Sequence, residues 1–258
     1  MSVSTAFEKA KADGRAALVG YLPAGFPDVD GSIEALKVMV AAGCDIIEVG
    51  LAYSDPVMDG PVIQAAVQQA LDGGVRTDDV FRVVEAVAAT GTPTLVMTSW
   101  NPVERHGVDR FAQRLYDAGG AGLITPDVTP EVVPDWIAAA DARDLDKVFL
   151  VAPSSTDERI AMTTSSCRGF VYATGIMGVT GTTQATAAGV APLIARTRAT
   201  TELPIGVGVG VSTGAQAADL SAHVDGVIVG TAFVRALGEG LPALTALTEE
   251  LAAGVRRA

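Results

Sequence analysis

The strongest constraint on the fold of this chain is an alternation of short apolar runs with longer segments of helical periodicity. The short runs are continuously apolar, which is typical of parallel strands covered on both faces. Helix-forming segments separate them, as in a fold built from strand and helix units. The eight runs lie at residues 17–22, 45–49, 93–98, 122–125, 147–151, 169–172, 204–209 and 226–229.

The helical segments complete this alternation along the whole chain. Pro61 and Pro130 stand in first turns, where a missing N–H is tolerated, and Thr77 and Asp157 are predicted N-caps. Eight units without a linker favour one domain over residues 1–258, a closed (β/α)8 TIM barrel, although a doubly wound open sheet gives the same local pattern. Helices are predicted at residues 28–42, 61–71, 77–90, 108–118, 130–140, 157–164, 187–200 and 213–221, with extra helices at the N-terminus, 231–237 and 242–255.

Composition excludes several classes of partner. A net charge of −12 argues against nucleic acid, whose binding depends on clustered Lys and Arg. No run of about 18 uncharged apolar residues is present, which argues against a membrane span. The first residues lack the apolar core of a signal peptide, so a cytoplasmic location is expected. Cys44 and Cys167 have no metal-ligand spacing, and Cys44 is expected to be a small buried hydrophobe.

Glu48 is the unusual residue of the second apolar run. A carboxylate in a buried strand costs several kcal/mol unless it is paired, protonated or functional. Asp55 and Asp59 follow in a loop rich in Pro and Gly, where Asp59 is expected to be exposed and ionised. A glutamate at a strand end and an aspartate in the next loop can converge on one ligand for acid–base chemistry. The alternative is that Glu48 pairs with a basic side chain and that the aspartates only form turns.

Glycines near the ends of the last strands suggest an anion site. The barrel's recurrent phosphate site uses the loops after strands seven and eight and the N-terminus of a short helix. Gly210, Gly230 and Thr231 suit this role, with Gly181 reaching in from the sixth loop. The alternative is that these glycines serve turns and close packing.

Other side chains narrow the chemistry. Tyr172 ends the sixth run, where its hydroxyl points into the barrel mouth or its ring fills the core. His106 and His223 lie near no nucleophile motif, which argues against a hydrolase triad. Trp100 and Asn101 are taken as the end of the third strand. No metal-ligand constellation or dinucleotide fingerprint occurs in the sequence.

Several of these motifs together resemble the tryptophan synthase alpha subunit family over nearly the whole chain. The matching segments are Leu22-Pro-Ala-Gly-Phe-Pro27, Glu48-Val-Gly-Leu-Ala-Tyr-Ser-Asp-Pro-Val-Met-Asp-Gly-Pro61, Gly178-Val-Thr-Gly181 and the glycine-rich endings at Gly210 and Gly230. The resemblance implies retro-aldol cleavage of indole-3-glycerol phosphate to indole and glyceraldehyde 3-phosphate, without cofactor or metal. It also implies a partner, a pyridoxal-phosphate-dependent beta subunit in an alpha2-beta2 heterotetramer.

The resemblance also assigns roles to residues of this chain. Glu48 would be the general acid at indole C3 and then the base on the glycerol hydroxyl, while Asp59 would bind the indole N–H. Tyr172 would assist at the reacting carbons, and Thr180 would orient Asp59. The remaining assignments are phosphate contacts at Gly181, Gly210, Gly230 and Thr231, and an indole pocket lined by Tyr21, Met97 and Ile124.

Two departures from the family pattern affect turnover and coupling rather than the fold. Ala52 stands where the family usually has proline, and Ser99 where near relatives usually have tyrosine. Two further hypotheses therefore stay open: a stand-alone indole-releasing lyase, and a catalytically weak binding module that activates a beta subunit. A neighbouring phosphate-binding barrel isomerase is disfavoured, because the only strand-borne lysine, Lys147, lies at a strand's beginning.

Overall fold

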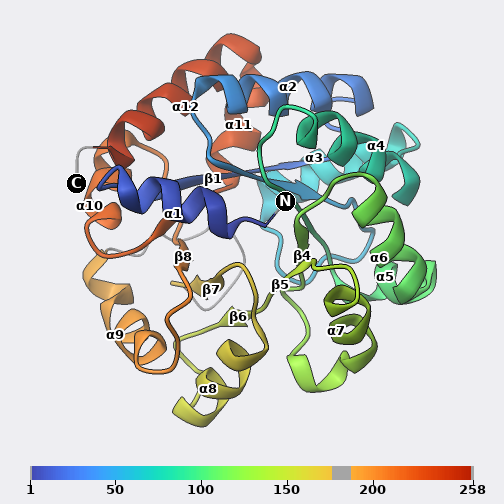
Figure 1. Cartoon of the computed structure of the whole chain (residues 1–258). Coiled ribbons are helices and arrows are strands. Elements are labelled where there is room, and N and C mark those ends of the chain that lie inside the picture. The colour runs from blue at the N-terminus through green and yellow to red at the C-terminus, as the bar shows by residue number, and fades with distance from the viewer. Residues whose placement is uncertain (1, 176–186, 257–258) are drawn as a thin grey trace.

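The chain forms a closed ring of parallel strands surrounded by helices (Figure 1). The computed structural model describes residues 2–175 and 187–256. Within them, nine parallel strands are hydrogen-bonded in the order β5-β4-β3-β2-β1-β9-β8-β7-β6. The strands are β1 (Ala17–Pro23), β2 (Ile46–Gly50), β3 (Thr94–Met97), β4 (Gly122–Ile124), β5 (Asp146–Val148), β6 (Leu150–Val151), β7 (Val171–Thr174), β8 (Ile205–Gly208) and β9 (Gly226–Val229).

The predicted (β/α)8 barrel is confirmed, and its fifth strand is interrupted. β5 pairs with β4 and β6 pairs with β7, while only Phe149 separates β5 from β6 in the chain. The ring of strands therefore closes between β5 and β6, which follow each other in the chain. At this closure the Tyr172 N–H donates a hydrogen bond to the Phe149 carbonyl at 3.2 Å. The two short strands share one of the eight barrel positions. That residues 1–258 form one domain stays a prediction.

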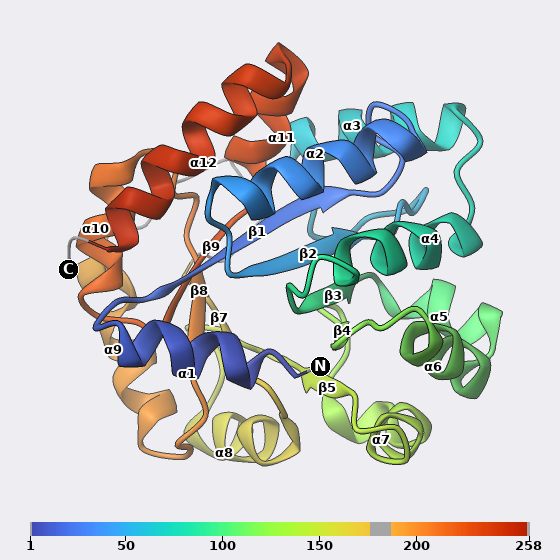
Figure 2. The same ribbon diagram turned by 45° about the horizontal axis from the view of Figure 1, so that its top comes forward.

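The helices form an outer layer around the strands (Figures 1 and 2). Most of them match the predicted segments, but a 3-10 turn and a separate helix replace the predicted helix at 130–140, because Pro134 starts a new helix. The described helices are α1 (Ser4–Ala12), α2 (Val29–Ala42), α3 (Pro61–Asp72), α4 (Thr77–Ala88), α5 (Trp100–His106), α6 (Val108–Asp117), η1 (Pro130–Val132), α7 (Pro134–Asp141), α8 (Asp157–Ser166), α9 (Ala187–Arg198), α10 (Gly214–Ser221), α11 (Thr231–Glu239) and α12 (Leu241–Val255).

The prediction that Trp100 and Asn101 end the third strand is wrong. β3 ends at Met97, and Trp100 begins the short helix α5. Both carboxylate oxygens of Asp127 accept from the Trp100 N–H at 3.0 Å. A carboxylate from the loop after β4 thus satisfies an N–H that a helix start leaves free.

The predicted N-caps are each displaced by one residue. The N-cap of α8 is Thr156, whose hydroxyl accepts from the Arg159 N–H, rather than Asp157. The N-cap of α4 is Arg76 rather than Thr77, and the Asp79 carboxylate accepts from the Arg76 N–H at 2.8 Å. In α4 the third helical residue therefore supplies the capping oxygen, an arrangement the sequence pattern did not reveal.

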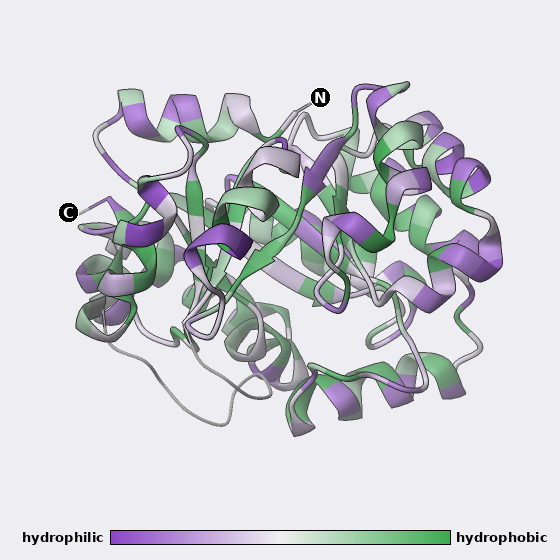
Figure 3. Cartoon of the chain, turned by 90° about the horizontal axis from the view of Figure 1, so that it is seen from below, coloured by the Kyte–Doolittle hydropathy of each residue, from purple (hydrophilic) through white to green (hydrophobic). Residues whose placement is uncertain are grey.

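Two apolar layers stabilise the barrel. Side chains such as Val19, Ile46, Leu95 and Phe170 fill the space inside the ring, and a larger cluster joins the outer strand faces to the helices. Figure 3 shows the strands mostly in the hydrophobic colour, while the helices alternate hydrophobic and hydrophilic segments. Strands covered on both faces account for the continuous apolar runs of the sequence.

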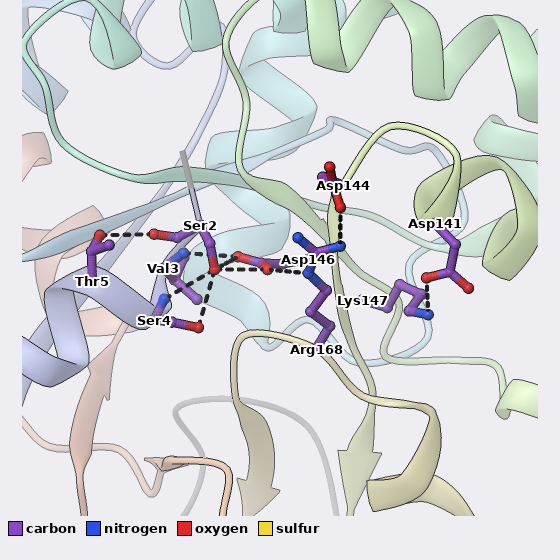
Figure 4. A network of polar contacts seen from close by, with 9 residues as sticks. All are labelled: Ser2, Val3, Ser4, Thr5, Asp141, Asp144, Asp146, Lys147 and Arg168. Atoms are coloured by element: carbon purple, nitrogen blue, oxygen red, sulfur yellow. Dashed lines mark hydrogen bonds and ion pairs between the residues drawn. The ribbon is translucent and has the colours of Figure 1, made fainter.

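Helix α1 closes the end of the barrel at which the strands begin. The Phe7 ring lies 5.3 Å from the Phe170 ring, inside the ring of strands. Asp146, at the start of β5, accepts from the Val3 N–H at 2.8 Å and from the Ser2 hydroxyl at 2.9 Å, and Arg168 lies 3.7 Å away (Figure 4). These contacts fix α1 across that end of the barrel.

Candidate active site

A pocket opens at the C-terminal ends of the strands, the end that carries chemistry in this architecture. Seven of the described strands contribute to its lining, and the loop after β2 covers part of it. Their contributions are Tyr21, Glu48, Met97, Leu150, Tyr172, Thr174, Gly208 and Ile228.

Glu48 is buried at this end of the barrel without a compensating partner. In β2 it is paired in register with Tyr21 of β1 and Leu95 of β3, and only 1% of its surface is exposed. Neither carboxyl oxygen has a hydrogen-bond partner among residues 2–175 and 187–256, so no basic side chain of these residues is hydrogen-bonded to Glu48. Burial raises the pKa of Glu48 to about 8, so the carboxyl holds its proton at neutral pH.

Asp59 lines the same pocket from the loop after β2. The Gln64 side-chain amide, in the first turns of α3, donates to the Asp59 main-chain carbonyl at 2.7 Å and so anchors the loop. Asp59 is half-buried rather than exposed as expected, and this burial raises the pKa of its carboxyl above the usual value. The reason is that the loop lies against the pocket instead of extending into solvent. Asp55, by contrast, is exposed and hydrogen-bonded to Ser54, in keeping with the turn interpretation.

Two tyrosines converge on Glu48 because glycines leave room for their rings. A Cβ atom at Gly50 would lie 2.4 Å from the Tyr21 hydroxyl, and one at Gly208 would lie 2.7 Å from the Tyr172 hydroxyl. Burial is the main reason why the pKa values of both phenols lie well above the usual value. The charge of Glu48 adds to the rise at Tyr172, and the charges of Asp59 and Glu48 add to it at Tyr21. Both phenols therefore keep their protons as possible donors.

The opposite side of the pocket is suited to an anion. Gly210, Gly230 and Thr231 all line it, and Gly230 directly precedes α11. No described side chain caps this helix. The first N–H groups of α11 also lack an intrahelical acceptor, so the end of the helix that lines the pocket carries a partial positive charge. Gly210 has φ +76°, which places its backbone in a conformation that favours glycine. Gly181, predicted to join this anion site, and Thr180, predicted to orient Asp59, lie outside the described residues.

Of the three residues predicted to line the indole pocket, Tyr21 and Met97 line the pocket of this structure. Ile124 ends β4 and is fully buried in the interior cluster, and Pro126, two residues later, lines the pocket. That Ile124 lines the indole pocket stays a prediction.

Sequence reasoning also missed residues of this site. Tyr53 and Met58 come from the loop after β2, and Ser212 from the loop after β8. Arg235 lies four residues after Thr231 on α11 and is the one cationic side chain among the described lining residues. Helical spacing from Thr231 was the signal that could have located it.

Comparison with known proteins identifies the relatives of this chain. The model of the family described as "Tryptophan synthase alpha chain" matches residues 7–257. The chain belongs to the tryptophan synthase alpha chain family. A tryptophan synthase alpha chain of Nocardia farcinica is 58% identical over 256 residues, which cover 99% of this chain and 96% of the relative. One from Salinispora arenicola is 58% identical over 262 residues, covering 98% and 97%.

Solved structures show the same architecture at high and at lower identity. A structure of Mycobacterium tuberculosis tryptophan synthase matches with a TM-score of 0.95 and 54% identity over 98% of both chains. The tryptophan synthase subunit alpha of Legionella pneumophila str. Paris matches with a TM-score of 0.90 at 29% identity, over 99% of this chain and 98% of that one. Fold and family are thus supported by alpha chains that differ widely in sequence.

Residues 2–175 and 187–256 contain no group of three or more His, Cys, Asp or Glu arranged to hold a metal ion. In the same part of the chain, no helix has the length and apolar character to span a membrane.

Proposed function

We propose that this chain cleaves indole-3-glycerol phosphate to indole and glyceraldehyde 3-phosphate, as the alpha subunit of a tryptophan synthase. It is a carbon–carbon lyase that uses acid–base chemistry without a cofactor or metal of its own. The observation that carries the proposal is Glu48, a buried carboxyl that lacks a described partner and faces the pocket. A cytoplasmic location and a heterotetramer with a beta subunit belong to the same proposal.

The chemistry follows from the protonation state of Glu48. With a pKa of about 8, its carboxyl carries a proton at neutral pH and donates it to indole C3. Asp59 accepts a hydrogen bond from the indole N–H and stabilises the positive charge that forms on the ring. Glu48, now a carboxylate, removes the proton of the glycerol hydroxyl. The bond between the glycerol carbon and C3 then breaks, its electrons restore the aromatic ring, and the proton of Glu48 has been returned.

The rest of the pocket holds the substrate for these steps. Tyr21 and Met97 are assigned to the indole side, and Tyr172, which lines the same pocket as Glu48, is assigned to the reacting carbons. Main-chain N–H groups at Gly210, Gly230 and Thr231 bind the phosphate, assisted by Gly181, while Thr180 orients Asp59; Thr180 and Gly181 belong to the segment outside the described residues. Phosphate binding at a helix N-terminus suits a chain whose net charge of −12 would repel an anion at long range.

An assay of indole release, with and without added beta subunit, tests this proposal. Strong stimulation by the beta subunit is expected of an alpha subunit. High activity of the chain alone would instead support a stand-alone lyase. An activated beta subunit with negligible cleavage would support a binding module and would contradict the catalytic assignment.

A further inference from the structure

Arg235 is a charged residue of the pocket to which the proposed reaction assigns no task. It lines the pocket together with Gly230 and Thr231, and it is exposed, so it lies where the pocket opens to solvent. The described lining residues include no other Lys or Arg, and the sequence of residues 176–186 contains neither. Arg235 is therefore the one cationic side chain that these parts of the chain offer to a ligand.

The helix places Arg235 beside the anion side of the pocket. Thr231 and Arg235 are four residues apart on α11, about one turn, so they lie on the same face of the helix. Side chains of a helix lean toward its N-terminus, so the long side chain of Arg235 extends toward the turn that begins at Thr231. The guanidinium and the free N–H groups of that turn can contact the same anion.

No carboxylate of the described residues forms an ion pair with Arg235. Glu239 follows it by one turn on α11, a spacing at which opposite charges commonly pair. The ion pairs of the described residues nevertheless all use other Arg or Lys side chains. The sequence of residues 176–186 contains no Asp or Glu. The guanidinium is thus available to an anion from solution.

The charge of a phosphate shows why a full positive charge matters here. A phosphate monoester carries about −1.5 to −2 charges at neutral pH, whereas a helix N-terminus supplies about half a positive charge. Asp59, a carboxylate in the proposed reaction, lines the same pocket, and the chain has a net charge of −12. Main-chain dipoles alone therefore leave most of the phosphate charge uncompensated.

We propose that Arg235 forms an ion pair with the substrate phosphate at the mouth of the pocket and so favours phosphorylated ligands over indole alone. The inference rests on the proposed function and adds a binding residue to it. A planar guanidinium donates two parallel hydrogen bonds to phosphate oxygens, which supplement the main-chain N–H groups of Gly230 and Thr231. Because the proton transfers occur at Glu48, loss of Arg235 should weaken binding rather than slow the chemical step.

The test is Arg235→Gln, which removes the charge but keeps a polar, helix-forming side chain. Affinity for glyceraldehyde 3-phosphate should fall about fivefold, the upper end for an exposed ion pair. KM for indole-3-glycerol phosphate should rise by a similar factor, with kcat within about twofold. Affinity for indole, which has no phosphate, should be unchanged. Arg235→Lys keeps the positive charge and should retain most of the affinity for glyceraldehyde 3-phosphate.

The matched control is Arg105→Gln, an exposed position on α5 that is not among the described lining residues. It makes the same change in net charge and should leave affinity for glyceraldehyde 3-phosphate within about twofold. Raising the ionic strength from about 0.1 M to about 1 M should narrow the difference between the unmodified chain and Arg235→Gln, because salt screens an exposed ion pair.

Three results would overturn the inference. They are unchanged affinity for glyceraldehyde 3-phosphate in Arg235→Gln, an equal loss in Arg105→Gln, and an equal loss of indole affinity in Arg235→Gln. A difference that does not narrow with salt would also contradict it, since the lost charge would not be the cause. Failure of the unmodified chain to release indole with its beta subunit would overturn the proposed function instead, so the two failures are distinguishable.

Discussion

The two ends of the barrel each bury one carboxyl, and the two side chains meet opposite conditions. Asp146, at the closed end, is fully buried and accepts from Ser2 and from the Val3 N–H, with Arg168 nearby. Glu48, at the open end, is as deeply buried but has no hydrogen-bond partner in the described part of the chain. Hydrogen bonds at Asp146 partly offset the rise that burial causes in its pKa, whereas Glu48 receives no such compensation.

This difference teaches how a buried carboxyl is used. A satisfied carboxylate connects segments that are far apart in the chain, here the N-terminus and β5, and so stabilises the fold. An unsatisfied one costs stability but holds a proton where a substrate can take it. The closed end should therefore respond to mutation mainly in stability, and the open end mainly in turnover.

The largest expected effect is on turnover, at Glu48. Glu48→Gln removes the proton donor while keeping the side-chain shape, so indole release should fall by about three orders of magnitude, within the range for a general acid. Binding of glyceraldehyde 3-phosphate should be largely intact. Steady-state kinetics and a direct binding titration check both points, and retained turnover would refute the acid assignment.

The next effect is on stability, at the other end. Asp146→Ala leaves the buried Val3 N–H without its acceptor and releases α1, which should lower the free energy of unfolding by about 2 kcal/mol. Indole release per folded molecule should be unchanged. Urea unfolding together with kinetics below the unfolding transition tests this, and a loss of turnover without a loss of stability would break the comparison.

A third change alters the open end without touching its carboxyls. Gly230→Asp adds a like charge at the proposed phosphate site and brings a side chain against the Tyr21 ring, so affinity for glyceraldehyde 3-phosphate should fall at least about tenfold. Gly238→Asp, later on α11 with no atom within 4 Å of a Cβ placed there, is the matched control. Equal affinities in the two variants would count against the anion site.

The smallest effect is expected at an exposed ion pair between two outer helices. Arg82 on α4 pairs with Asp30 on α2, and both side chains are exposed. Arg82→Ala should change the free energy of unfolding by less than about 1 kcal/mol and leave indole release unaltered. A large change in either quantity would show that burial is not what separates the important charges from the unimportant ones.

How far the sequence predicts this molecule differs between fold and site. Continuous apolar runs located every barrel strand, because buried parallel strands leave a pattern that depends only on local residues. The break at Phe149 and the helix α5 depend on hydrogen bonds from residues far away in the sequence, which no local pattern reveals. The cap of α4 is local, but it was missed because Arg76 is not a preferred N-cap residue.

At the site, Glu48 was recognisable as a charge within an apolar run. Its neighbours in the site were harder to recognise from the sequence. The half-burial of Asp59 depends on where a loop lies, and the contacts of Tyr21 depend on glycines in other strands.

The most direct test of the central claim is the pH dependence of stability for the unmodified chain and for Glu48→Gln. The unfolded chain releases the Glu48 proton near the ordinary carboxyl range, whereas the folded chain holds it to about pH 8. Between these limits the folded state binds more protons, so the stability of the unmodified chain relative to Glu48→Gln should fall by about 1.4 kcal/mol per pH unit as pH rises. Parallel stability curves from pH 5.5 to 7.5 would show that Glu48 is ionised or paired in the folded protein, and would contradict the account.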